Sequence, residues 1–234
     1  MQVITMASQK GGSGKTTLAG HLAVAAGRAG AGRVVVIDTD PQGSLSDWWN
    51  ARTPETPEFV QTGVSRLAHD LETLDSMGVD LVIVDTPPAI TSTISQVVAV
   101  SDLVIVPTRP SPHDLRAAGA TVDLVERAGK PLVFVVNAAK VRARITSEAA
   151  IALSQHGTVA PTTVHERTDF AAAMIDGRTV MELPRSGKSA GEIAELWRYL
   201  AERLSGGRRE TMLTAQGERA PAHKRSVLPD AATA

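Results

Sequence analysis

Two kinds of apolar pattern alternate along the chain. Short runs rich in Val and Ile, typical of parallel strands buried on both faces, occupy residues 3–6, 33–37, 80–84, 103–106 and 132–136. Longer stretches with Ala, Leu and Val at i, i+3 and i+4, typical of amphipathic helices, occupy residues 18–29, 64–74, 94–100, 115–128, 145–155 and 190–204. This alternation predicts an α/β fold, with a mostly parallel, twisted sheet and helices on both faces.

Polar, Gly and Pro residues gather directly after the expected strands. These segments are residues 9–17, 38–43, 85–88, 107–114 and 137–144. Parallel strands end at one edge of the sheet, and ligands of open α/β sheets bind at that carboxyl edge. We therefore expect the functional site there. Ser111-Pro112-His113-Asp114 predicts a helix start with Ser111 as its cap, rather than a catalytic His–Asp pair.

One of these segments has the composition of a phosphate-binding loop. Lys10-Gly11-Gly12-Ser13-Gly14-Lys15-Thr16-Thr17 stands between an expected strand and an expected helix, which is the context that such a loop requires. Glycines let backbone N–H groups curl around a phosphate, and the helix N-terminus adds its positive dipole end. Lys15 would reach the β- and γ-phosphates, and the Thr16 hydroxyl would ligate Mg²⁺.

Three aspartates follow two of the other strands: Asp38 and Asp40 after one, and Asp85 after residues 80–84. Residues two apart in an extended segment point to the same side, so Asp38 and Asp40 can both face a nucleotide. Asp85 is interpreted as the Walker B carboxylate, bound to Mg²⁺ directly or through water. The alternative for all three is structural: they end strands and cap helices, including a helix after Pro41-Gln42-Gly43.

Three motifs together carry a family resemblance. Lys-Gly-Gly-x-Gly-Lys-Thr at 10–16, Asp-x-Asp-Pro-Gln at 38–42 and Asp-x-Pro-Pro at 85–88 resemble the deviant Walker A ATPases of the ParA/MinD group. The resemblance covers roughly residues 1–204 and is closest to small ParA-type proteins without an N-terminal helix-turn-helix. It implies a P-loop NTPase fold, ATP and Mg²⁺ as cofactors, and weak ATP hydrolysis that a partner stimulates.

The resemblance also implies roles for single residues. Lys10 would cross a two-fold interface to the ATP phosphates of the partner subunit, so that ATP joins a homodimer; the alternative is an exposed lysine that only aids solubility. Asp40 would position or activate the attacking water, and Asp38 would help to hold the magnesium shell. Asn137, after the strand at 132–136, would contact the adenine; the alternative is a turn residue.

Basic residues in the second half of the chain are candidates for contacts with DNA phosphates. By the resemblance these are Arg142, Arg144 and Arg167, with Arg185 and Lys188 behind them. The alternative is ordinary exposed charge. Because the net charge of −1 supplies no global basic field, such nonspecific DNA binding would be weak and steeply salt-dependent.

Composition excludes several other classes. The chain has no cysteine, which excludes thiolate-ligated iron–sulfur carriers, cysteine zinc sites and thiol nucleophiles. No apolar run approaches the ~20 residues that span a bilayer. Residues 1–20 lack the charged start, apolar centre and small-residue cleavage site of a signal peptide. Residues 205–234 have no helical period, so we expect a disordered tail after a domain of residues 1–204, without the amphipathic membrane helix of MinD-like proteins.

The function that this pattern favours is a partition ATPase. ATP binding would join two subunits, the dimer would bind nonspecific DNA, and a separate ParB-like or adaptor protein would stimulate hydrolysis. A plasmid, a chromosome region or a protein cargo would be positioned, with the protein in the cytoplasm on the nucleoid. The alternatives are a MinD-like, membrane-cycling regulator of division or flagellar placement, a tether that binds ATP and DNA with incidental hydrolysis, and, less favoured, a metabolic synthetase.

Overall fold

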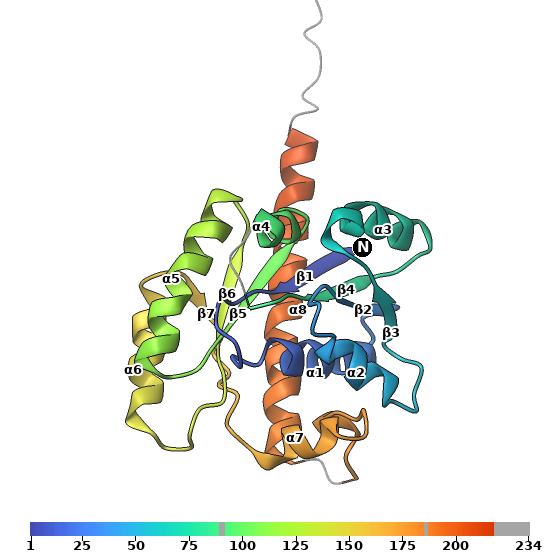
Figure 1. Ribbon diagram of the computed structural model, residues 1–234. Coiled ribbons are helices and arrows are strands. Elements are labelled where there is room, and N and C mark those ends of the chain that lie inside the picture. Colours follow the sequence, from blue (N-terminus) through green and yellow to red (C-terminus); the bar gives the residue numbers. More distant parts are fainter. Residues whose placement is uncertain (89–91, 185–186, 218–234) are drawn as a thin grey trace, which may run out of the picture.

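The described chain forms one seven-stranded parallel sheet with helices on both faces (Figure 1). The computed structural model describes residues 1–88, 92–184 and 187–217. The strand order is β3-β2-β4-β1-β5-β6-β7. The strands are β1 (Gln2–Met6), β2 (Val34–Asp38), β3 (Glu58–Gln61), β4 (Leu81–Asp85), β5 (Leu103–Thr108), β6 (Leu132–Val136) and β7 (Thr158–Val159).

Helices cover the sheet in two layers. They are α1 (Lys15–Arg28), α2 (Ser44–Asn50), α3 (Val64–Ser76), α4 (Ser92–Ala99), α5 (Pro112–Arg127), α6 (Arg144–Ser154), α7 (Thr168–Met174), the 3-10 helix η1 (Val180–Glu182) and α8 (Lys188–Gly217). The helices α1, α2, α7 and α8 pack on one face, and α3 to α6 pack on the other. Successive strand residues point to opposite faces, so Val36 joins the first layer while Val35 and Ile37 join the second.

All the strands and helices that the apolar pattern predicts are present. Their ends shift by a few residues, as in α5, where Ser111 is the cap and its hydroxyl accepts the Asp114 N–H at 3.2 Å. The pattern does not predict β3, β7, α2 and α7, because none of them exceeds seven residues. The two helices are shorter than the window of about 11–18 residues over which helical periodicity stands out, and the two strands have too few apolar residues to differ from a loop. The last helix runs on to Gly217 instead of ending near 204; residues 205–217 include Arg, Glu, Met and Leu, which favour helix. Residues 218–234 of the expected tail lie outside the described residues.

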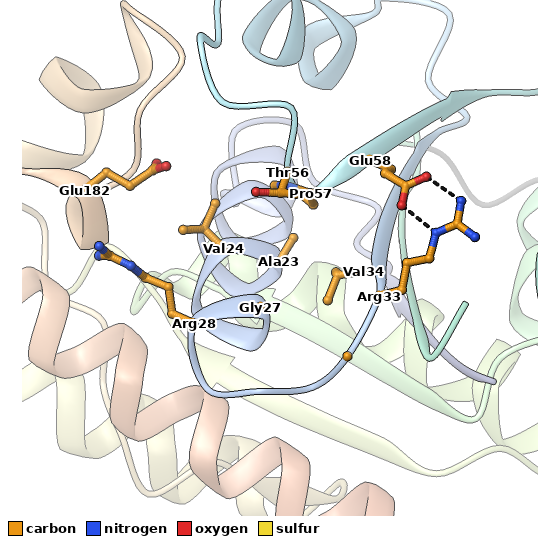
Figure 2. Close-up of a pocket in the computed structure, with 11 residues that line it drawn as sticks. Ala23, Val24, Gly27, Arg28, Arg33, Val34, Thr56, Pro57, Glu58 and Glu182 are labelled. Atoms are coloured by element: carbon orange, nitrogen blue, oxygen red, sulfur yellow. Dashed lines mark hydrogen bonds and ion pairs between the residues drawn. The ribbon is translucent and has the colours of Figure 1, made fainter. Parts of the chain in front are cut away.

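A pocket of about 350 Å³ opens beside the C-terminal half of α1 (Figure 2). Its floor is apolar, with Val24 of α1 and Val34 of β2, and its rim is charged. On the rim, Arg33 and Glu58 form a bidentate pair with N–O distances of 2.6 and 2.8 Å. This pocket lies at the amino end of β2, opposite the edge where the sequence places the site. No helix of the described chain has the length and apolar character needed to cross a membrane.

His21 makes folding stability depend on pH. His21 lies on the buried face of α1, and its ring packs against that of Phe170 with the ring centroids 5.0 Å apart. Burial lowers the pKa of His21 to about 4, although its hydrogen bond with the Thr17 carbonyl acts in the opposite direction. The folded state therefore disfavours the imidazolium, while the unfolded chain protonates near 6.5. The contribution of neutral His21 to the free energy of unfolding is fully present above pH 6.5. It is lost as the pH falls towards 4, which lowers the free energy of unfolding by on the order of 3 kcal/mol.

Urea unfolding of wild type and His21→Leu between pH 7 and pH 4 tests this. The variant keeps every other titrating group, so the difference between the two pH profiles isolates His21. We expect the free energy of unfolding of the wild type to fall more steeply below pH 6.5. Parallel profiles would contradict the prediction.

Candidate nucleotide site

Strand register brings the acidic motifs together at the carboxyl edge of the sheet. In the pairing of β2 with β4, Asp38 stands opposite Asp85, and in the pairing of β1 with β4, Met6 stands opposite Asp85. Side chains fasten these strand ends: the Thr39 hydroxyl donates to the Asp85 carbonyl at 2.7 Å, and the Thr86 hydroxyl donates to the Met6 carbonyl at 2.6 Å. The segments that the sequence selects after β1, β2 and β4 therefore converge.

The loop between β1 and α1 has the backbone of an anion cradle. Gly12 and Gly14 adopt φ values of 73° and 97°, and α1 begins at Lys15 directly after Gly14. The first-turn amides of a helix have no carbonyl partner within it. They face the loop together with the positive end of the helix dipole, which favours a phosphate.

Asn137 supports this loop from the end of β6. Its side-chain Nδ2 donates to the Ser13 carbonyl at 2.7 Å. A Cβ at Gly14 would lie 2.1 Å from that nitrogen, so the glycine is required both by its φ and by this contact. Here Asn137 holds the phosphate loop, a contact that the sequence did not indicate; the adenine contact stays a prediction.

The buried Lys15 and Asp85, with the partly exposed Thr16 between them in the contact network, form the centre of the site. The Thr16 hydroxyl donates to Asp85 Oδ2 at 2.5 Å. Burial raises the pKa of Asp85 to about 7, with nearby Asp38 adding to the rise and the bond from Thr16 opposing it. Burial also lowers the pKa of the Lys15 ammonium, against the charges of Asp85 and Asp40. A bound polyanion would stabilise the Lys15 ammonium, and the cation bound with it would stabilise the Asp85 carboxylate.

Asp38 and Asp40 differ in what they contact. Asp38 Oδ2 accepts the N–H groups of Leu45 and Ser46 at 3.1 and 2.9 Å and the Ser46 hydroxyl at 3.0 Å. Its Oδ1 accepts the Asp40 N–H at 3.0 Å. Asp38 thus takes the capping role that the sequence left as the alternative, and its place in a magnesium shell stays a prediction. Asp40 is partly exposed, and its Oδ1 accepts the Gln42 N–H at 2.9 Å.

The donor set fits Mg²⁺ held together with nucleotide phosphates. Mg²⁺ takes oxygen ligands and usually binds through one or two carboxylates plus phosphates, which matches the Thr16 hydroxyl and the buried Asp85 carboxylate in contact with it. Within the described residues, no group of three or more His, Asp or Glu side chains is arranged to hold a metal by itself.

Comparisons with known proteins identify the family of this fold and loop. Residues 4–180 match the CobQ/CobB/MinD/ParA nucleotide binding domain. The chain belongs to this ParA/MinD family. It is 30% identical over 198 residues to the maintenance of carboxysome distribution protein A of Halothiobacillus neapolitanus, covering 81% of this chain and 91% of that protein. It is 29% identical over 231 residues to protein ParA of Rhizobium radiobacter, covering 95% and 91%.

Solved structures of ParA/MinD proteins share the fold. The cell division ATPase MinD of Pyrococcus furiosus superposes with a TM-score of 0.72 at 18% identity, over 86% of this chain and 98% of that one. A variant of Cyanothece McdA in complex with ATP superposes with a TM-score of 0.68 at 17% identity, over 86% and 96%. The predicted α/β P-loop fold and the ParA/MinD assignment are therefore confirmed.

Two cations flank the mouth of the family's phosphate loop. Lys10 is exposed, and its backbone N–H donates to the Ser8 hydroxyl at 3.3 Å. Arg109 follows β5, and its Nη2 would lie 3.9 Å from a Cβ at Gly12; it has no ion pair among the described residues. Arg109 is not among the residues that the sequence motifs indicate. The sequence feature that could have indicated Arg109 is a basic residue directly after a strand, at the carboxyl edge of the sheet.

The predicted DNA-contacting arginines lie on two adjacent segments. Ala139 pairs with His165, and the Glu166 N–H donates to the Ala139 carbonyl at 2.9 Å. These contacts place the loop that carries Arg142 beside the segment that carries Arg167. Arg142 is exposed at the unusual φ of 61°.

The other basic candidates are not equally available. Arg144 is exposed but pairs with Glu148 at 2.8 Å. Arg167 is largely buried, and its Nη2 donates to Glu192 at 2.5 Å, so its charge is neutralised within the protein. Lys188 is exposed at the start of α8, and Arg185 lies outside the described residues. Arg142 and Lys188 are therefore the exposed candidates that have no ion pair among the described residues.

Proposed function

We propose that this ParA/MinD-family chain is an ATP-dependent positioning ATPase whose ATP-bound homodimer binds DNA nonspecifically. The observation that carries the proposal is the exposed Lys10 at the mouth of the phosphate loop, on the far side of which lie the buried Lys15, the partly exposed Thr16 and, at the end of β4, the buried Asp85. A cation in this place can reach a second subunit's nucleotide without disturbing its own site. ATP would then join the two subunits and build the DNA-binding surface.

Each site residue has a role in this proposal. The loop amides and Lys15 bind the phosphates, and Thr16 and Asp85 hold Mg²⁺, which would neutralise charge on the phosphates. Asp40, the most accessible of the three aspartates, orients the water that attacks the γ-phosphate. Asp38 holds the Asp40 segment through the bonds described above.

For the cargo and the partner protein, we propose only the general class. Similar proteins are named maintenance of carboxysome distribution protein A, protein ParA and chromosome-partitioning ATPase Soj. We propose that a separate ParB-like or adaptor protein stimulates hydrolysis and connects the cargo, which is a plasmid, a chromosome region or a protein body. Nonspecific DNA contact through Arg142, joined by Arg144 when it exchanges Glu148 for a DNA phosphate, would place the protein on the nucleoid.

DNA binding by wild type and Lys10→Ala to a random duplex tests the proposal, with ATP, ADP or no nucleotide over a salt series. We expect wild type to bind only with ATP, and the affinity to fall steeply with salt because phosphate contacts release counterions. Lys10→Ala is expected to bind at least about tenfold more weakly, the cost of one charged contact of about 1.4 kcal/mol or more.

Arg127→Ala is the matched control, because Arg127 is an exposed cation in the last turn of α5, away from the loop. It should bind DNA like wild type. If wild type does not bind DNA in any nucleotide state at low salt, the proposal fails.

A further inference from the structure

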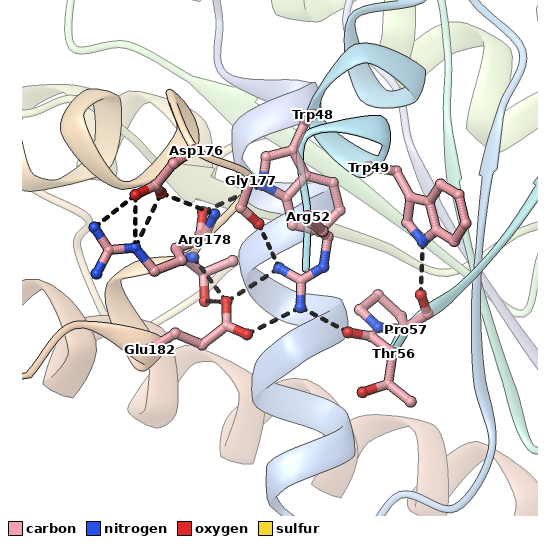
Figure 3. Close-up of polar contacts among 10 residues, drawn as sticks. Trp48, Trp49, Arg52, Thr56, Pro57, Asp176, Gly177, Arg178 and Glu182 are labelled. Atoms are coloured by element: carbon pink, nitrogen blue, oxygen red, sulfur yellow. Dashed lines mark hydrogen bonds and ion pairs between the residues drawn. The ribbon is translucent and has the colours of Figure 1, made fainter. Parts of the chain in front are cut away.

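Arg52, just beyond α2, has a buried side chain that joins its own segment to residues 177–182, which lie about 125–130 positions further along the sequence (Figure 3). Its side chain is only 1% exposed. One terminal nitrogen donates to the Gly177 carbonyl and the other to the Thr56 carbonyl, both at 2.6 Å. The same two nitrogens donate to the Glu182 carboxylate at 3.1 and 2.9 Å. We call Arg52 and Glu182, with the Gly177 and Thr56 carbonyls, the Arg52 clamp.

The clamp leaves its segments little freedom to move. Glu182 also accepts the Thr179 N–H and hydroxyl at 2.8 and 3.0 Å. Burial raises the pKa of Glu182, but the hydrogen bonds from Arg52 and Thr179 outweigh it and hold the pKa below its ordinary value. A Cβ at Gly177 would lie 2.3 Å from the Arg52 backbone nitrogen. The loop before η1 is therefore in direct contact with the end of α2.

Trp48 connects the clamp to the helix of the phosphate loop. The Arg52 guanidinium lies 4.7 Å from the centre of the Trp48 ring, and the indole N–H donates to the Arg178 carbonyl at 3.2 Å. The other side of the indole is packed on α1, where a Cβ at Gly20 would lie 3.2 Å from the ring. The position of α2 is thus set by α1 and the clamp together.

The opposite end of α2 holds the acidic motif. The N–H groups of Leu45 and Ser46 in its first turn donate to Asp38, whose other oxygen accepts the Asp40 N–H. A helix of seven residues is about 10 Å long, so it can transmit a fixed position from one end to the other. We propose that Arg52 and Glu182 are positioning residues for hydrolysis, holding α2 so that its first turn keeps Asp38 and Asp40 in place. This inference rests on the proposed function through the role of Asp40.

Hydrolysis kinetics of Glu182→Gln test the inference. Glutamine keeps the side-chain shape and one acceptor oxygen, but it replaces the other acceptor oxygen with an NH₂ donor and removes the charge that pairs with Arg52. We expect kcat to fall about tenfold, because small displacements of a positioned group lower rates strongly, while the Kd for ATP stays within about twofold, since Lys15 and the loop are untouched.

Glu58→Gln is the matched control. It breaks the bidentate pair with Arg33 on the rim of the pocket in Figure 2, to which Glu182 and Thr56 also contribute. This pair has the same geometry but is more exposed than the Arg52–Glu182 pair, and among the described residues neither Arg33 nor Glu58 hydrogen-bonds to α2. Its kcat and Kd should match wild type. Equal kcat for Glu182→Gln and wild type, or equal losses in both Gln variants, would overturn the inference, as would a loss of ATP affinity that matches the loss of kcat.

Amide hydrogen exchange gives a readout that does not depend on activity. If the clamp holds α2, the Leu45 and Ser46 amides exchange faster in Glu182→Gln than in Glu58→Gln. A role confined to the loop before η1 would change exchange only around residues 177–182 and would overturn the inference. If wild type hydrolyses no ATP, the proposed function fails while this measurement still tests the clamp.

Discussion

Replacing Gly14 with alanine is expected to lower ATP affinity by at least about 30-fold. A side chain at φ 97° is strained by about 1–2 kcal/mol, and the new Cβ would lie 2.1 Å from Asn137 Nδ2. Asn137 must then move and release the Ser13 carbonyl, which costs a further 1–3 kcal/mol or so if the carbonyl stays buried. The combined cost of about 2–5 kcal/mol falls on the loop that binds the phosphates.

Titration with fluorescent ATP measures the effect, and two further variants separate its causes. Gly14→Ala with Asn137→Ala removes the clash but not the φ strain, so part of the affinity should return. Gly27→Ala, in the same helix with nothing within 4 Å of its Cβ, should bind ATP like wild type. Wild-type affinity in Gly14→Ala would show that the loop geometry described above does not form the binding site.

Replacing Asp40 with alanine or asparagine is expected to slow ATP hydrolysis by about 10²–10⁴-fold, the usual contribution of a group that orients or activates water. Asparagine keeps an oxygen that can accept the Gln42 N–H, as Asp40 Oδ1 does at 2.9 Å, but loses the charge. Both variants should retain ATP and accumulate as ATP-bound dimers, because the phosphate loop is unchanged. Single-turnover hydrolysis and light scattering with ATP measure the two quantities.

The pair of substitutions distinguishes chemistry from local structure. If Asp40 serves only to form its turn, asparagine restores hydrolysis and alanine does not. If hydrolysis is incidental to a tether, neither variant changes DNA release. Equal, large losses with both substitutions support the role of Asp40 in positioning water.

The sheet and the phosphate loop could be predicted because their signals are local. A buried parallel strand such as residues 132–136 must be apolar throughout, and the phosphate loop needs Gly12 and Gly14 for positive φ and Lys15 for charge. Each requirement restricts the residue types within a few positions. The short β7 and α7 have no comparable pattern in the sequence, because their conformation depends on packing against distant segments.

The partners of the site's charged and polar groups were decided by tertiary structure. By itself the sequence determined the α/β fold, the nucleotide loop and the acidic edge, since periodicity and backbone geometry act between near neighbours. Only folding showed that Asp38 is held by the first turn of α2, that Asn137 holds Ser13, and that Glu182 holds Arg52 across 130 positions. The physical reason is that a hydrogen bond or ion pair needs two groups within about 3 Å, and strand order and helix packing set that distance.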